Sequence, residues 1–310
     1  MATSRDPIMA ASPDSEKHIN FVSGISTRTT PPYSFDIASS ARIADPSDLE
    51  AQIRHLPREH RLPAFFDQDI AHDILLEVEL LILSFATGIL DATTFPSYSV
   101  FTSKQTGNTI LLALAAVQNK VVIQTEPNVA VAISLFVAGA TIFGHLGNWF
   151  GQKRRLWLLI TNLMQTTLVF GATALRFWGS DERTGPFALG VIAMLSFACG
   201  GQISLALCVR MPELNTTMVT GAIVQFVADE KLFHAKNASR NRRLAFYFSM
   251  LGGAFVGAVV GKFVNPTLGL LLVASLKTVV TFLFLFNSSK GKRARDYFTK
   301  SPDIMVLFGD

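Results

Sequence analysis

The chain of 310 residues is 49% hydrophobic and only 16% charged, and its mean hydropathy is +0.36. Soluble domains carry about 25% charged residues, so this composition excludes a soluble enzyme. The net charge is only +4, and the basic residues stand beside apolar segments, which favours contact with anionic lipid over nucleic acid. The composition predicts an all-α integral membrane protein with polar ends.

The N-terminal part divides into two segments. Residues 1–64 are rich in Ser, Pro, Asp and Arg and show no helical periodicity, which predicts a disordered tail. Residues 65–79 place their apolar side chains on one helical face. This pattern predicts a short amphipathic helix on the membrane surface. An N-terminal extension of the first membrane span fits the same pattern.

Eight apolar blocks follow, and they differ in length. Crossing the hydrocarbon core takes about 20 helical residues. Six blocks reach that length: 80–98, 129–150, 156–177, 187–209, 244–264 and 267–286. The blocks 106–122 and 216–228 are shorter. We therefore predict six full spans and two short re-entrant or half helices, with eight spans as the alternative.

The short blocks occupy matching places in two halves of the chain. Residues 114 positions apart are identical at several points: Thr106-Gly107 with Thr220-Gly221, Gly139 with Gly253, and Gly147 with Gly261. These matches predict two internal repeats, over residues 80–178 and 187–286. Paired short segments in two halves point to the binding site of a transporter.

The basic residues predict an orientation. A cluster at Lys153–Arg155 falls in a very short loop between two predicted spans, and such clusters face the cytoplasm. Six spans then place both termini inside the cell. Residues 287–310 become a second cytoplasmic tail, and the pattern does not identify which membrane holds the protein.

Two charged residues fall inside predicted spans. Asp91 stands about twelve residues into the first span, where a bare carboxylate costs about 3 kcal/mol. It predicts a site for proton or ion coupling, although a polar residue near a helix break at Pro96 fits as well. Lys277 lies midway along the last span. An Asp91–Lys277 pair would compensate both charges, and snorkelling of the lysine stem is the alternative.

The starts of the two short blocks carry small polar residues. Such residues cap helix N-termini, whose free backbone N–H groups attract anions. We expect the two starts to face each other and to form a polar pocket, or else to cap interfacial helices. The candidate binding or coupling residues are Asp91, Gln105, Thr106, Gly107, Asn108, Gln202, Thr217, Thr220, Gly221 and Lys277.

A glycine stripe at Gly253, Gly257 and Gly261 repeats every four residues. This spacing lets helices approach closely and predicts a packing face. The sequence contains none of the common catalytic motifs and no metal-type spacing of Cys or His. It therefore predicts a protein that is not an enzyme and that holds no cofactor or metal.

A family resemblance rests on the same motifs. The run G-I-L-D-A-x-x-F followed by V-F-x-S-x-x-T-G-N-T spans Gly88–Thr109, and T-T-x-V-T-G spans Thr216–Gly221. Together they resemble the YoaK-type family of multi-pass membrane proteins, which carry domain of unknown function 1275. The resemblance covers about residues 75–290, and Ile203 stands where the family usually has Asn. It implies the fold and brings no substrate.

These observations predict a secondary transporter of a small polar or anionic solute, with Asp91 available for proton coupling. The alternative is a non-transporting membrane scaffold, assembly factor or lipid-interacting protein. The expected partners are membrane lipid and an unknown small solute, without nucleic acid. Assembly into a homo-oligomer is left open.

Overall fold

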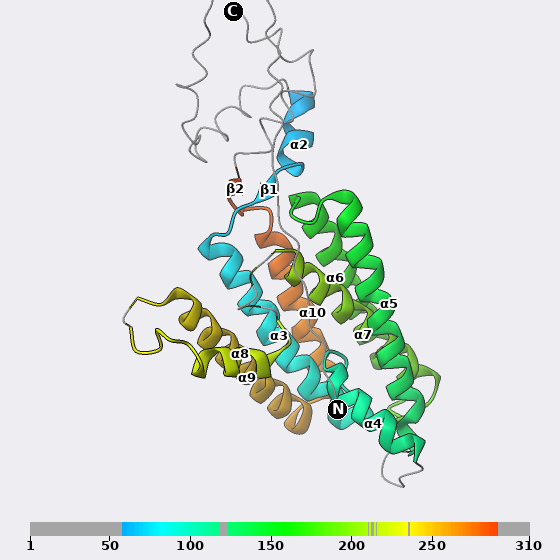
Figure 1. Ribbon diagram of the computed structural model, residues 1–310. Helices are drawn as coiled ribbons and strands as arrows, with labels where there is room; N and C mark the ends of the chain where they lie inside the picture. The colour runs from blue at the N-terminus through cyan, green and yellow to red at the C-terminus, as the bar shows by residue number, and fades with distance from the viewer. Residues whose placement is uncertain are drawn as a thin grey trace, which may run out of the picture. The chain divides into compact units, whose positions relative to one another are not determined.

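The computed structural model describes residues 58–117, 123–209, 211, 214, 216–234 and 236–290. These residues are almost entirely helical (Figure 1). The elements are α2 (Arg58–Phe66), β1 (Asp69–Ile70), α3 (Ile74–Tyr98), α4 (Gln105–Ala116), a 3-10 turn (Ile123–Thr125), α5 (Glu126–Phe150), α6 (Arg155–Trp178), α7 (Pro186–Cys208), α8 (Val219–Val227), α9 (Ala238–Phe263), α10 (Pro266–Leu283) and β2 (Ser289–Lys290). The tails predicted over 1–64 and 287–310 lie outside the described residues, except for residues 58–64 and 287–290.

Five of the described helices are long and apolar enough to cross a membrane, namely α5, α6, α7, α9 and α10. Their outward faces carry large apolar side chains, such as Phe255 at 65% exposure and Phe282 at 61%. A protein surrounded by water rarely leaves so much apolar surface open, whereas lipid tails solvate it. The protein is therefore an integral membrane protein. A further long helix, α3, has 25 residues and packs along α9 and α10.

The helices α4 and α8 are too short to cross a membrane. They contain 12 and 9 residues, which at 1.5 Å per residue gives about 18 Å and about 14 Å against a core of about 30 Å. The α3 helix ends at Tyr98, and the next residue, Ser99, turns the chain with a φ of 56°. Residues 100–104 then run back toward the middle of α3, where Ser103 bonds to Asp91. The α4 helix therefore starts beside the middle of α3.

The first and second halves of the chain cross each other in matching pairs. The most extensive contacts join α3 to α9 and α5 to α7, and α10 lies on α3 as α6 lies on α7. At each of the two main crossings, two glycines lie directly against backbone carbonyls of the neighbouring helix. A Cβ atom added at any of these glycines would overlap the carbonyl. The four pairs are Gly88 with Met250, Gly253 with Phe85, Gly139 with Phe197, and Gly200 with Phe136.

The predicted glycine stripe on α9 is only partly a packing face. Gly253 and Gly257 lie against the α3 backbone, at Phe85 and Ile89. Gly261 is different, because a Cβ atom there would meet nothing within 4 Å. The prediction was therefore wrong for Gly261. The four-residue spacing of glycines continues along α9 beyond the point where α9 and α3 lie in close contact.

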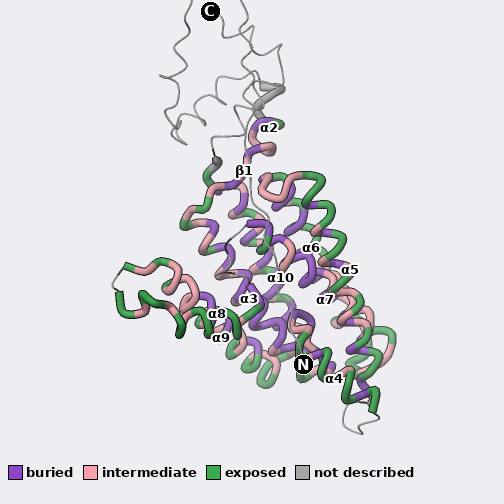
Figure 2. The backbone as a smooth tube through the Cα atoms, viewed as in Figure 1, coloured by how far each residue is buried: buried purple, intermediate pink, exposed green. Residues whose placement is uncertain are grey.

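The core lies where α3, α6, α7 and α10 meet. Side chains such as Leu80, Leu83, Ile192 and Leu195 are at most 1% exposed. Figure 2 shows buried backbone along α3 and α7, while α5 and α9 present long exposed faces. In lipid, where apolar surface gains nothing by leaving the solvent, close packing of this kind holds helices together.

The segment predicted as one amphipathic helix over residues 65–79 is divided instead. The α2 helix ends at Phe66, the strand β1 follows, and α3 begins at Ile74. Asp73 caps α3 by accepting a hydrogen bond from the Leu76 N–H at 2.9 Å, and this cap fixes the helix start. Residues 74–79 are thus an extension of the first long helix.

A short antiparallel ladder joins the segment just before α3 to the segment just after α10. β1 pairs with β2, with Asp69 opposite Lys290 and Ile70 opposite Ser289. Beside the ladder, the buried Asn287 side chain donates to the Glu79 carboxylate at 2.7 Å. The Arg155 guanidinium donates to the Asn287 carbonyl. The start of α3, the start of α6 and the end of α10 therefore meet at one end of the bundle.

Candidate functional site

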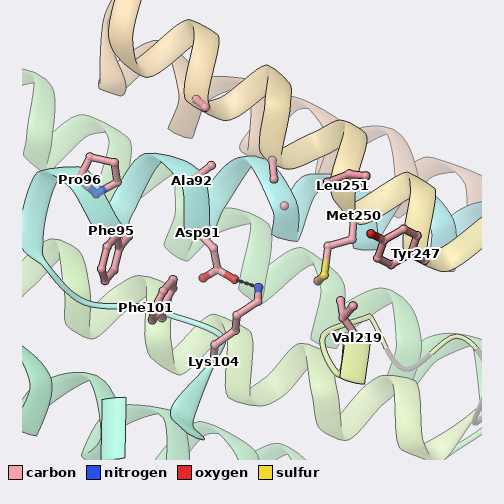
Figure 3. A pocket seen from close by; sticks show the side chains of 13 residues that line it. Asp91, Ala92, Phe95, Pro96, Phe101, Lys104, Val219, Tyr247, Met250 and Leu251 are labelled. Carbon is pink, nitrogen blue, oxygen red and sulfur yellow. Dashed lines mark hydrogen bonds and ion pairs between the residues drawn. The ribbon is translucent and has the colours of Figure 1, made fainter. Parts of the chain in front are cut away.

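Asp91 lies in the middle of α3 and is only 5% exposed. Its carboxylate accepts hydrogen bonds from the Ser103 N–H at 3.3 Å and from the Ser103 hydroxyl at 2.5 Å. It also forms an ion pair with Lys104 (Figure 3). The returning segment after α3 thus supplies every one of these donors. A buried carboxylate is stable in such a place because its charge is paired and its lone pairs are used.

The predicted pair between Asp91 and Lys277 was wrong. The Lys277 ammonium donates instead to Gln165 Oε1 at 3.0 Å and to Gln202 Oε1 at 2.8 Å. The snorkelling alternative also fails, because Lys277 is only 3% exposed. The pairing was missed because no motif or periodicity indicates that residues 100–104 fold back onto α3.

Lys277 belongs to a polar cluster at the centre of the helix core. Gln202 on α7 donates through its side-chain N–H to the Thr87 hydroxyl on α3 at 2.9 Å. Gln165 comes from α6 and Lys277 from α10, so the cluster joins all four central helices. Sequence reasoning identified Gln202 and Lys277 but missed Gln165 and Thr87, which carry no distinctive motif.

A cavity of about 730 Å³ lies between the starts of α4 and α8, and we call it the polar cavity because hydroxyl, amide and ammonium side chains line it beside apolar ones such as Phe136, Ile203 and Met218. The structure brings together in its lining six of the predicted residues: Gln105, Thr106, Gly107, Thr217, Thr220 and Gly221. Lys104 also lines it. Neither Lys104 nor Met218, the residues that precede the two helices, caps its helix with a side chain. Residues of the first turns of both helices, such as Thr106 and Thr220, therefore border the cavity.

Asn108 has a structural position behind this cavity. It is fully buried, and its amide donates to the Phe101 carbonyl at 2.6 Å while its oxygen accepts from the Phe101 N–H at 3.0 Å. It also donates to Gln105 Oε1 at 2.8 Å. Asn108 therefore attaches the returning segment to the first turn of α4 and fixes the place of Lys104.

A second, apolar cavity of about 480 Å³ lies between α3 and α9. Figure 3 shows Asp91 and Lys104 at its inner wall, with Phe95 and Phe101 to one side and Met250 and Tyr247 to the other. The rings of Phe95 and Phe101 are stacked with centroids 4.4 Å apart. Sequence reasoning did not assign Lys104 or Ser103, although both lie inside the V-F-x-S motif and its extension.

Metal-binding groups do not gather in this region. Across the part of the chain that the structure describes, no three residues among His, Cys, Asp and Glu lie together in a way that could hold a metal ion. The charged groups of the two cavities are therefore Asp91 and Lys104.

Comparison with known proteins gives a family and no named relative. No curated protein matches the chain, and no solved structure matches it. The family model described as "Protein of unknown function (DUF1275)" matches residues 80–283, from α3 to the end of α10. This match confirms the resemblance predicted from the paired motifs. The chain belongs to the DUF1275 family.

Proposed function

We propose that the protein is a secondary transporter of a small polar or anionic solute. The observation that carries this proposal is the polar cavity between the starts of α4 and α8. Short helices that begin inside a membrane bundle present free backbone N–H groups to a solute. Such irregular backbone is tolerated at membrane depth where it lines a cavity.

Two related halves, 80–178 and 187–286, form the transporter in this proposal. The order long helix, short helix, long helix, long helix occurs twice, as α3–α6 and α7–α10. The exchanged glycine contacts at the α3–α9 and α5–α7 crossings support this relation. Alternating access then comes from movement of one half against the other around the cavity.

Six membrane crossings with both tails in the cytoplasm complete the proposed topology. The pairing of β1 with β2 brings residues 70 and 289 together, which supports an even number of crossings between them. The helix α3 then adds a sixth span to the five that qualify by composition. Arg154 and Arg242 lie at the ladder end, where Arg242 contacts Glu77 at 2.5 Å, and basic groups favour the cytoplasmic side.

Asp91 is the coupling carboxylate in this proposal, with Lys104 rather than Lys277 as its counter-charge. A proton that neutralises Asp91 would release the Lys104 ammonium toward the polar cavity. The protein thus acts as a carrier and not as an enzyme, with membrane lipid and a small solute as its partners. The alternative of a non-transporting scaffold depends on the basic loops, the amphipathic segment and the N-terminal tail, most of which lies outside the described residues, and stays a prediction.

Purified protein in liposomes tests the proposal. The probes are radiolabelled acetate, lactate, phosphate and glycerol, and their uptake is compared with uptake into protein-free vesicles. We expect faster uptake of at least one anion, loss of that uptake in Asp91→Asn, and normal uptake in Asp181→Asn. Asp181 is a suitable control because its side chain is 87% exposed and lies outside both cavities. Folded wild-type protein that moves none of the four probes would contradict the proposal.

A further inference from the structure

The polar and apolar cavities adjoin each other. Three residues line both of them, namely Phe101, Lys104 and Val219. The polar cavity has hydroxyls and amides in its lining together with apolar side chains such as Phe136 and Ile203, whereas the other is lined almost entirely by apolar side chains, most of them from α3 and α9. A molecule placed across the boundary would meet a polar environment at one end and an apolar one at the other.

The charges at the boundary are not equally accessible. The Asp91 side chain is 6% exposed and already accepts from Ser103 and Lys104. The Lys104 side chain is 33% exposed, and its ammonium has three N–H donors, one of which goes to Asp91. An arriving ligand therefore meets a cation first, and the first residues of α4 and α8 line the cavity on the same side.

The apolar cavity has the size and shape for a compact hydrocarbon group. Its volume of about 480 Å³ falls within the range of small-molecule sites, roughly 300 to 1,000 Å³. The stacked pair of Phe95 and Phe101 forms one flat wall. Met250 and Leu251 of α9 lie on the other side of the cavity (Figure 3), and Ala254 of the same helix also lines it.

We propose that the two cavities form one site for a small amphipathic organic anion. Its carboxylate or sulfonate bonds to Lys104 in the polar cavity, and its apolar ring or branched chain fills the cavity between α3 and α9. This inference rests on the proposed function, because it names the substrate class of the same site. It adds the apolar half of the ligand, which transport of a polar solute alone does not require.

Calorimetric titration of the protein in lipid nanodiscs tests this assignment without any measurement of flux. The probes are acetate, benzoate, phenylacetate, benzyl alcohol and benzylamine. Phenylacetate should bind at least roughly tenfold more tightly than acetate, because its ring leaves water. The neutral alcohol and the cationic amine should bind at least roughly tenfold more weakly than phenylacetate, since neither can pair with an ammonium.

Two variants locate the binding. Lys104→Met should abolish binding of all three carboxylates. Ala258→Phe fills the apolar cavity from the exposed side of α9 and should remove the preference for phenylacetate over acetate. Val259→Phe is its matched control, because Val259 is the next residue on α9, is also exposed and lines neither cavity.

Three results would overturn the inference. Equal binding of acetate and phenylacetate would remove the apolar half of the site. Equal effects of the Ala258 and Val259 variants would place binding elsewhere. Affinity that keeps rising through octanoate to laurate would indicate an open lipid-facing groove. Failure of the proposed function can be distinguished from failure of this inference. Tight binding of phenylacetate without uptake would contradict transport and leave the inferred ligand class intact.

Discussion

The described parts of the two halves have the same order of long and short helices and differ in the charged residues beside the short ones. Lys104 precedes α4 and Met218 precedes α8. Asp91 stands three residues after Gly88, which lies against the Met250 carbonyl of α9. Ile203 stands three residues after Gly200, which lies in the same way against the Phe136 carbonyl of α5. The ion pair of the first half thus corresponds to two apolar side chains in the second. Glycine contacts set the packing, while the charged site is confined to one half.

The largest expected effect tests whether the two crossings are alike. Gly139→Val and Gly253→Val each force a side chain into a backbone carbonyl, of Phe197 and Phe85 respectively. We expect each to cost about 3 kcal/mol of stability, because backbone cannot yield as a side chain does. Thermal unfolding in detergent measures the loss.

Gly261→Val is the matched control, since open space surrounds that position. It should unfold within a few degrees of the wild type. Tolerance of the Gly139 substitution alongside failure of the Gly253 substitution would show that the two crossings are not equivalent.

The next effect concerns the cluster that joins the halves. Gln202→Leu removes one of the two carbonyl oxygens that bond to the Lys277 ammonium. Leaving a buried charge short of partners should cost about 3 kcal/mol. Adding Lys277→Met should recover part of that stability, because the buried charge is removed while Gln165 loses its donor. A double variant less stable than the single one, in chemical or thermal unfolding, would argue against this account.

A smaller effect follows from making the first half resemble the second. Asp91→Ile alone should cost about 1–2 kcal/mol, since it leaves Lys104 without its carboxylate at a partly exposed position. The double variant Asp91→Ile, Lys104→Met copies the residues of the second half and should regain part of the loss. Its affinity for carboxylates, measured by titration, should nevertheless be absent. Unchanged affinity would separate the ion pair from binding.

The smallest effect lies outside the membrane, in the segment between α8 and α9. Asp229 accepts from the Lys231 N–H at 2.9 Å and from Arg243 at 2.9 Å, and the backbone donor above all holds the pKa of Asp229 below its usual 3.8. A lowered pKa stabilises the fold above the unfolded-state pKa, and the effect disappears as the pH falls through the folded-state value. Asp229→Asn should therefore flatten the acid side of a plot of Tm against pH. Glu230→Gln removes a neighbouring charge that makes neither bond and should leave the slope unchanged.

Much of the fold could be predicted because helix length and apolarity carry it. The long helices and the two short ones follow from the spacing of charges and from the Thr-Gly pairs at 106–107 and 220–221. The meeting of the two short-helix starts followed from their matching places in the chain. These signals are local or periodic, and a single sequence displays them directly.

The partners of the charged groups could not be predicted in the same way. Asp91 pairs with Lys104 because the chain reverses at Ser99, and a positive φ at a serine leaves no mark in composition. Lys277 is compensated by amides from two other helices, which depends on how those helices rotate within the bundle. Gly261 fits the glycine pattern and fails as a contact because helix crossing angles decide where a stripe ends.

The ladder between β1 and β2 brings the two ends of the helix bundle, from β1 to β2, together in a ring-like arrangement. Backbone hydrogen bonds join its two open ends, with the Ala71 N–H donating to the Ser288 carbonyl at 2.8 Å. Such an arrangement can be opened at another loop. A chain permuted in this way would be synthesised with its helices in a different order and could still form the same contacts. A circular permutant opened between α8 and α9, with a linker across the ladder, should keep every crossing described above. In it, α9 and α10 would enter the membrane before α3, and α7 and α8 would enter last.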